Sequence, residues 1–281
     1  MSFSNRYGYK SIRKELQIDS MDKALRNSLW NITYKKIEIF LDELYEDLIC
    51  NFFKDTLEVK YPLYDMMDKY AQRTSDLKKR FFNLEWHEAY DFLEFLANSE
   101  LFKQNQSHIK THLKNYKQEV NIVLEREFSA YRFVDNIIVK ITDENEIEAI
   151  EKAISNVGNK FKPISTHLQT SLIKLSDKKK PDYRNSIKES ISAVEACCRI
   201  LTGENTLGKA LDNLEKNGII INAQLKQAFE KLYAYTNSKS SGIRHSIIEL
   251  GEKPEFEDAK YMLSSCSSFI NYLISKSKNS A

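Results

Sequence analysis

Apolar residues recur every three to four positions along most of this chain, which is the spacing of amphipathic helices. Polar and charged residues fill the positions between them, so each segment has one face suited to a core and one suited to water. The segments with this pattern cover about residues 21–53, 85–99, 107–131, 164–175, 183–201, 222–233 and 257–275, with a short helical turn at about 243–250. We therefore expect a mainly helical protein.

One stretch breaks the helical pattern. In YRFVDNIIVKIT, residues 131–142, β-branched and aromatic residues flank Asp135 and Asn136. Asp and Asn tolerate the positive φ angles that tight hairpin turns require. The stretch predicts a small β-hairpin. The helix that follows is expected to start with Asp143 as its cap and Glu146 as the second member of a capping box.

Gly158 and Pro163 interrupt the pattern after this helix, and we place a domain boundary there. The expected domains are residues 1–158 and residues 159–281. The predicted fold is all-α: a helical N-terminal domain with one small β-hairpin, followed by a helical bundle. The scarcity of the helix-breaking residues supports this, with only 7 Gly and 4 Pro in 281 residues.

The balance of basic and acidic residues excludes a strong electrostatic field of one sign over the whole protein. Forty-two basic and 40 acidic residues leave a net charge of +2, so any basic patch for nucleic acid must be local. The run at residues 178–180 is either a solvated basic linker or a steering element for nucleic acid. The charged N-terminus and the lack of a long apolar run predict a cytoplasmic chain without a membrane segment.

The remaining motifs argue against several chemistries. The four cysteines, Cys50, Cys197, Cys198 and Cys266, lack CxxC spacing, and we expect them reduced, with Cys197 and Cys198 packed as small apolar residues. His108 and His112 have the spacing of two zinc ligands, but Ile109 stands where a metalloprotease helix has its glutamate. Nucleotide, dinucleotide and serine-hydrolase motifs are missing from the sequence. We expect no metal and no cofactor.

Arg244 and His245 form the most suggestive pair. They follow a Ser-Gly loop in NSKSSGIRHSIIEL, and a helix capped by Ser240 or Ser241 would place them near unpaired backbone N–H groups. A phosphate bound there would meet Arg244 as a bidentate clamp and His245 as a proton acceptor. With RNA, His245 could take the proton of the 2′-hydroxyl and the arginine could stabilise the developing charge. A solvated surface pair is the alternative interpretation.

The segment YRNSIKESISAVEACCRIL, from Tyr183, adds a charged stripe. On a helical wheel Arg184, Lys188, Glu195 and Arg199 border an apolar face, where the edge of a cleft would lie. The alternative interpretation is a surface ion pair between Glu195 and Arg199, four residues apart, which explains the same pattern without a functional site.

Four stretches together resemble the AbiJ-type abortive-infection proteins, with an N-terminal domain of the fourth AbiJ class and a C-terminal HEPN domain. They are GYKSIRKELQIDSMDKALRNSLWNI, EREFSAYRFVDNIIVKITDENEIEAIEKAI, DYRNSIKESISAVEACCRILTGENTLGKALDNLEKNG and LKQAFEKLYAYTNSKSSGIRH. The resemblance implies a HEPN bundle, a homodimer, and a metal-independent endoribonuclease acting on cellular or phage RNA. It also implies a phage trigger or an antitoxin as partner.

Carried over by position, the resemblance assigns catalysis to Arg244 and His245, and we add Glu195 as a candidate for orienting the histidine. Candidate substrate contacts are Arg184, Asn185, Lys188 and Lys239. Active HEPN nucleases have four to six residues between arginine and histidine, whereas here the two are adjacent and would point about 100° apart on a helix. Lys239 lies at the usual distance, and the arginine could also be Arg184 or come from a second subunit. A non-catalytic HEPN-like module for RNA or a partner is the alternative function.

Overall fold

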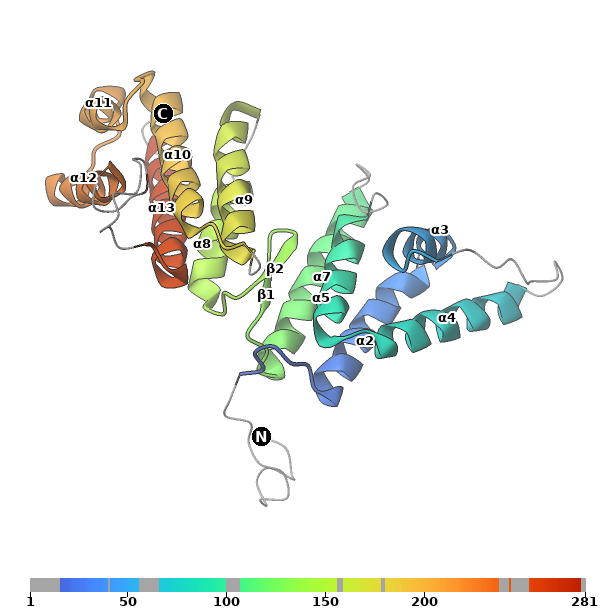
Figure 1. Cartoon of the computed structure of the whole chain (residues 1–281). Coiled ribbons are helices and arrows are strands. Elements are labelled where there is room, and N and C mark those ends of the chain that lie inside the picture. The colour runs from blue at the N-terminus through green and yellow to red at the C-terminus, as the bar shows by residue number, and fades with distance from the viewer. Residues whose placement is uncertain are drawn as a thin grey trace, which may run out of the picture. The chain divides into compact units, whose positions relative to one another are not determined.

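The computed structural model describes residues 16–39, 41–55, 66–99, 107–155, 159–177, 180–237, 243 and 253–278. Contacts divide the chain into two compact units, Met1–Lys140 and Ile141–Ala281, and each is described by itself. Helices dominate both units, and a two-stranded hairpin is the only sheet among the described residues (Figure 1). The prediction of an all-α fold with one small hairpin is confirmed.

The N-terminal unit packs its helices around an aromatic-rich core. Trp30, Phe81 and Phe92 are almost fully buried, with ring centroids 5.4 Å apart for Trp30 and Phe81 and 5.3 Å apart for Phe81 and Phe92. Such tilted and edge-to-face pairs stabilise the fold beyond the contribution of the apolar area that they bury. The elements are α2 (Lys23–Ile39), α3 (Leu41–Asp47), the π-helix η1 (Leu48–Phe52), α4 (Met66–Asn83), α5 (Trp86–Asn98), α7 (Ser107–Arg126), β1 (Arg132–Val134) and β2 (Ile137–Val139).

The hairpin forms where the sequence predicts it. Strands β1 and β2 are antiparallel and joined by Asp135 and Asn136, and Asp135 has a φ of 55°. Side chains from two helices hold the turn: the amide of Asn98 donates to the carbonyl of Asn136, and Lys117 Nζ donates to the carbonyl of Asp135 at 2.7 Å. The hairpin is therefore fixed to α5 and α7 of its own unit.

The second unit is a bundle centred on α10, with α9 and α13 packed against it (Figure 1). Helix α8 packs against α13 and α9. Its isoleucines Ile147, Ile150 and Ile154 are buried, and Asn271 of α13 donates to the carbonyl of Ala149 at 2.8 Å. The elements are α8 (Glu144–Ser155), the 3-10 turn η2 (Asn159–Phe161), α9 (Lys162–Ser176), α10 (Tyr183–Thr202), α11 (Leu207–Asn213), η3 (Glu215–Asn217), α12 (Ala223–Asn237) and α13 (Phe256–Lys278).

Three buried serines hold α9 and α10 together. Ser171 Oγ lies 3.0 Å from Ser186 Oγ and 2.8 Å from Ser190 Oγ, and Ser186 Oγ donates to the carbonyl of Ser171. Their small side chains let the two helices approach closely, and every hydroxyl in the cluster has a partner, as a buried polar group needs.

The predicted capping box of α8 forms only in part. The carboxylate of Asp143 accepts from the backbone N–H of Glu146 at 3.0 Å, as expected for the cap. The carboxylate of Glu146 instead accepts from Lys260 of α13 at 3.1 Å. A contact within the bundle therefore uses the side chain that the local pattern assigned to the box.

Among the described residues, two α-helices were missed by the sequence pattern. Helix α4 is rich in charged residues, and its apolar stripe rests on few positions, with Leu77 and Phe81 fully buried. Helix α11 has seven residues, too few for the period to show. No helix in the described part of the chain is long and apolar enough to cross a lipid bilayer.

The four cysteines are free, and Cys197 and Cys198 are buried, as predicted. Cys266 is also buried, whereas Cys50 is exposed. Burial raises the pKa of the Cys198 and Cys266 thiols to about 12, so both stay protonated near neutral pH.

Candidate functional site

The candidate site is built around the N-terminus of α10. Asp182 is its N-cap, and its carboxylate accepts from the backbone N–H of Asn185. The amide of Asn185 donates to both carboxylate oxygens of Asp182 at 2.9 Å, and Lys174 Nζ lies 3.1 Å from Oδ2. The amide nitrogen of Asn185, a predicted substrate contact, is thus engaged in the cap, while its role toward substrate stays a prediction.

The same contacts set the charge state of the cap. Partial burial by itself would raise the pKa of Asp182, but the hydrogen bonds from Asn185 and Lys174 outweigh it and hold the pKa below its ordinary value. The carboxylate is therefore charged at neutral pH. The carboxylate of Asp182 caps the N-terminus of α10 and holds Lys174 of α9 beside that helix end.

Two contacts bring the following part of the chain to this same helix end. Arg184 Nε donates to the carbonyl oxygen of Ile243 at 3.0 Å, and Ile243 is only 1% exposed. The ring of Tyr183 meets the ring of Phe256 edge-on, with centroids 6.1 Å apart. Adjacent residues at the start of α10 thus anchor Ile243 on one side and the first residue of α13 on the other.

The anchored residues bracket the predicted catalytic pair in the sequence. Arg244 follows Ile243 directly, and His245 comes next. Both lie outside the described residues, as does Lys239, so their roles stay predictions. What the described residues establish is that the chain enters this segment beside Arg184 and reaches α13 beside Tyr183.

Lys188 and Glu195 lie further along α10. Lys188 is exposed one turn beyond Arg184, and Glu195 is half-buried eleven residues beyond it, a rise of about 16 Å. After burial, the charge of Glu195 is the second factor that raises the pKa of the Cys198 thiol. Two residues of chain span at most about 7 Å, so Glu195 can orient His245 only if the segment after Ile243 runs along α10.

Sequence reasoning missed one acid–base pair. His167 Nδ1 of α9 lies 2.7 Å from Glu189 Oε2 of α10, and the two side chains are 37% and 23% exposed. A carboxylate beside Nδ1 fixes the tautomer and leaves Nε2 as an acceptor when the ring is neutral. The partners are 22 residues apart, so no local spacing could have revealed the pair.

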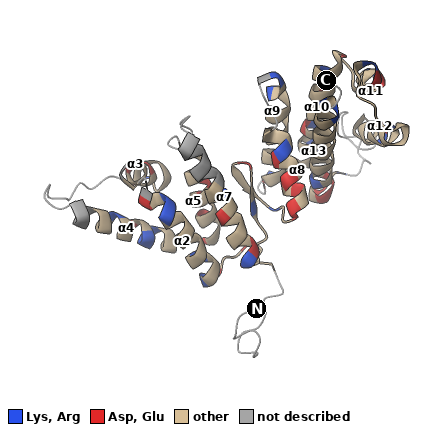
Figure 2. Cartoon of the chain, turned by 180° about the vertical axis from the view of Figure 1, so that it is seen from behind, with Lys and Arg blue, Asp and Glu red and all other residues tan. Residues whose placement is uncertain are grey.

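Charge is mixed over both units. Lys and Arg are interspersed with Asp and Glu, and acidic residues gather on α8 (Figure 2). Within the part of the chain that the structure describes, no three His, Cys, Asp or Glu side chains gather to form a metal site. Basic residues near the start of α10 include Lys174, Lys180, Arg184 and Lys188, so positive charge is present beside the candidate site although the net charge of the chain is small.

The fold defines the chain as an all-α protein of two helical units, the second organised around a capped central helix. The family model described as AbiJ N-terminal domain 4 matches residues 1–156, and the chain belongs to this family. The AbiJ domain identifies it as a defence-related protein of the abortive-infection kind. Searches of the curated proteins and of the solved structures found no match.

Proposed function

We propose that the protein is a metal-independent endoribonuclease of the HEPN type that cleaves cellular or phage RNA in the cytoplasm during abortive infection. The observation that carries the proposal is the anchoring of the chain around Arg244 and His245 at the start of α10, through the Arg184–Ile243 hydrogen bond and the Tyr183–Phe256 contact. The AbiJ N-terminal domain supports the defence role.

The proposed chemistry needs a base, a positive charge and a phosphate held between them. His245 would take the proton of the 2′-hydroxyl, and the 2′-oxygen would then form a bond to the neighbouring phosphorus to give a 2′,3′-cyclic phosphate. The bond from phosphorus to the 5′-oxygen of the next nucleotide would break, and that oxygen would take up a proton from the protonated His245 or from water. Arg244 or Arg184 would stabilise the charge on the phosphate oxygens. Lys188 and Lys239 would contact the RNA backbone, and Glu195 would orient His245.

The proposal includes a homodimer formed through the C-terminal domain. The adjacency of Arg244 and His245 supports this part of the proposal, because the two would point about 100° apart on a helix and a second subunit could supply the arginine opposite the histidine. A phage trigger or an antitoxin would control the activity, since an unrestrained ribonuclease would harm its own cell.

The test is cleavage of total bacterial RNA by the purified full chain in the presence of EDTA. Wild type is expected to give discrete fragments, and His245→Ala is expected to give none while keeping its thermal unfolding profile. His167→Ala is a matched control, because it removes another histidine beside α10 without touching the proposed site. It is expected to cleave like wild type.

Two results would contradict the assignment. Cleavage by a folded His245→Ala protein would remove His245 from the mechanism. RNA binding without cleavage by wild type, tested with and without phage infection of the producing cells, would favour the non-catalytic RNA-binding or regulatory module.

A further inference from the structure

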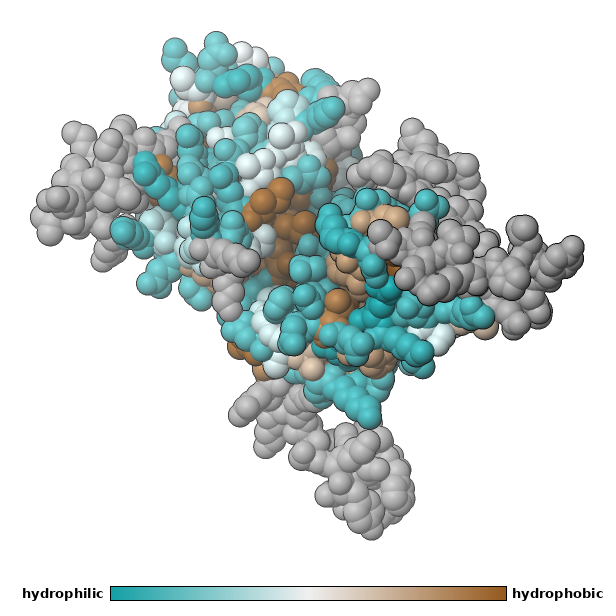
Figure 3. Space-filling model, turned by 45° about the vertical axis from the view of Figure 1, so that its right-hand side comes forward, coloured by the Kyte–Doolittle hydropathy of each residue, from teal (hydrophilic) through white to brown (hydrophobic). Residues whose placement is uncertain are grey.

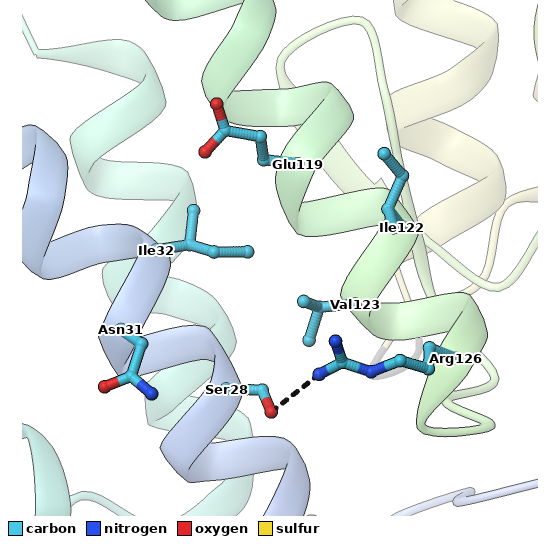
Figure 4. A pocket seen from close by; sticks show the side chains of 7 residues that line it. All are labelled: Ser28, Asn31, Ile32, Glu119, Ile122, Val123 and Arg126. Carbon is cyan, nitrogen blue, oxygen red and sulfur yellow. Dashed lines mark hydrogen bonds between the residues drawn. The ribbon is translucent and has the colours of Figure 1, made fainter. Parts of the chain in front are cut away.

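A groove on the N-terminal unit lies between α2 and α7 and has a volume of about 300 Å³ (Figure 4). It lies outside the proposed nuclease site, which belongs to the other unit. Its lining includes Ser28 and Ile32 from α2 and Glu119, Ile122, Val123 and Arg126 from α7.

Polar bridges between the helices stand at both ends of the groove. At one end Arg126 Nη2 donates to Ser28 Oγ at 2.8 Å, and at the other Lys36 Nζ donates to Glu119 Oε1 at 3.2 Å. Ser28, near the start of α2, thus meets Arg126 at the end of α7. Lys36, near the end of α2, meets the earlier α7 residue Glu119, so the two helices run antiparallel. Arg126 also forms an ion pair with Glu127, with Nη2 2.9 Å from Oε1. The side chains of Glu119 and Arg126 remain 42% and 59% exposed, so both can still meet a partner.

The middle of the groove is apolar. The side chains of Ile32 and Val123 point into it (Figure 4), and Val123 is 4% exposed. Ile122 is 62% exposed at this groove, so a large apolar side chain is available there beside the buried Val123. Hydrophilic residues cover much of the face shown in Figure 3, with hydrophobic residues among them.

The dimensions fit a helix better than a small molecule. Glu119 and Arg126 are seven residues apart on α7, which is two helical turns or about 10 Å. Side chains at positions i, i+3 or i+4, and i+7 of a partner helix share one face and cover the same length. A small-molecule pocket encloses most of its ligand, whereas the most exposed apolar side chain here projects into solvent.

We propose that this groove binds an amphipathic helix of a partner protein. The helix would carry an acidic side chain facing Arg126, a basic side chain about two turns away facing Glu119, and apolar side chains between them that cover Ile122. The inference uses the N-terminal unit alone and does not depend on the nuclease proposal.

The test uses the full chain as bait for a displayed library of helical peptides of about five turns, with randomised side chains on one face. Enriched peptides are expected to carry the acidic–apolar–basic pattern and to bind wild type in calorimetry. Ile122→Glu is expected to weaken their binding at least about tenfold, because a charge then replaces the buried apolar contact. Arg126→Glu is expected to select peptides with a basic residue in place of the acidic one.

Ile173→Glu is the matched control. Ile173 is 58% exposed on α9 of the other unit, so the substitution makes the same chemical change at a similar exposure, and peptide binding is expected to be unchanged. Thermal unfolding of both variants checks that the fold is kept. Failure to enrich any peptide, or equal binding of the peptides to Ile122→Glu, would overturn the proposal. A lower mass of Ile122→Glu than of wild type in sedimentation would instead assign the groove to a second copy of the chain, which also overturns it.

Discussion

Arg184 connects two parts of the chain that are 59 residues apart, through its bond to the carbonyl of Ile243. A guanidinium Nε–H has a fixed direction, so the bond specifies where the backbone lies as well as supplying charge. Because Arg244 and His245 follow Ile243, we expect Arg184 to act as a positioning residue for them. A direct contact with the RNA phosphate would give Arg184 a different signature in kinetics.

Substitution of Arg184 separates these roles. Arg184→Ala is expected to lower kcat for RNA cleavage at least about tenfold with a smaller effect on KM, because the pair is misplaced while RNA binding persists. The free energy of unfolding should fall by about 1–2 kcal/mol from loss of a half-buried hydrogen bond. Cleavage kinetics and urea unfolding measure the two effects.

Arg184→Lys and Arg199→Ala serve as controls. Lysine keeps the charge but cannot reproduce the Nε geometry, so a positioning role predicts that Arg184→Lys stays impaired. Arg199 is exposed near the end of the same helix, and its removal should leave kcat unchanged. Wild-type kinetics for Arg184→Lys would show that charge alone matters.

Residue patterns could predict part of this site and not the rest. Helical periodicity placed Arg184 and Lys188 at the edge of the apolar face of α10. The bond to Ile243 and the pairing of His167 with Glu189 depend on how helices pack, and neither leaves a local spacing in the sequence. The use of Asn185 in the cap had a local signal, since Asp182 lies three residues before it.

At the scale of the element, the charged cap of α10 should make the helix sensitive to acid. The pKa of Asp182 is lowered in the folded protein, so its stabilisation is present above the pKa of an unfolded Asp, about 4, and is lost as the pH falls through the lowered folded value. Asp182→Ala is expected to cost about 1 kcal/mol of unfolding free energy at pH 7 and less below pH of about 4. Chemical denaturation across this pH range measures the difference.

A surface carboxylate provides the comparison. Asp212 is 67% exposed and pairs with Lys226, so Asp212→Ala should change stability little, because exposed ion pairs contribute little. An Asp182→Ala cost that stays constant as the pH falls would show that the charge of the cap is unimportant.

The elements themselves were predictable where one face is clearly apolar. The segments that became α5, α9, α10 and α13 show a regular stripe, and the hairpin had both its β-branched flanks and its Asp-Asn turn. Helix α4 was missed although its apolar and polar residues lie on different faces, because its many charged residues make it hydrophilic on average and only Leu77 and Phe81 of its described side chains are buried.

At the scale of the whole molecule, the placement of α8 distinguishes the end of the family match from the end of the first packed unit. The family match runs to residue 156 and includes α8, and the sequence places the boundary at residues 158–159. In the structure α8 packs within the second unit, burying Ile147, Ile150 and Ile154 and bonding to α13 through Glu146 and Ala149. The end of a family match and the end of a packed unit therefore differ by one helix.

Fragments of the second unit test this division. A fragment of residues 141–281 is expected to unfold cooperatively on heating, whereas residues 159–281 should lose the transition or melt at a much lower temperature. Burying one isoleucine contributes about 1.5–3 kcal/mol, so three of them approach the whole stability of a small domain, about 5–15 kcal/mol. Circular dichroism melts, with ANS fluorescence to detect the uncovered face of α13, measure the difference. Equal melting of the two fragments would place the boundary after α8, because α8 would then contribute nothing to the bundle it packs against.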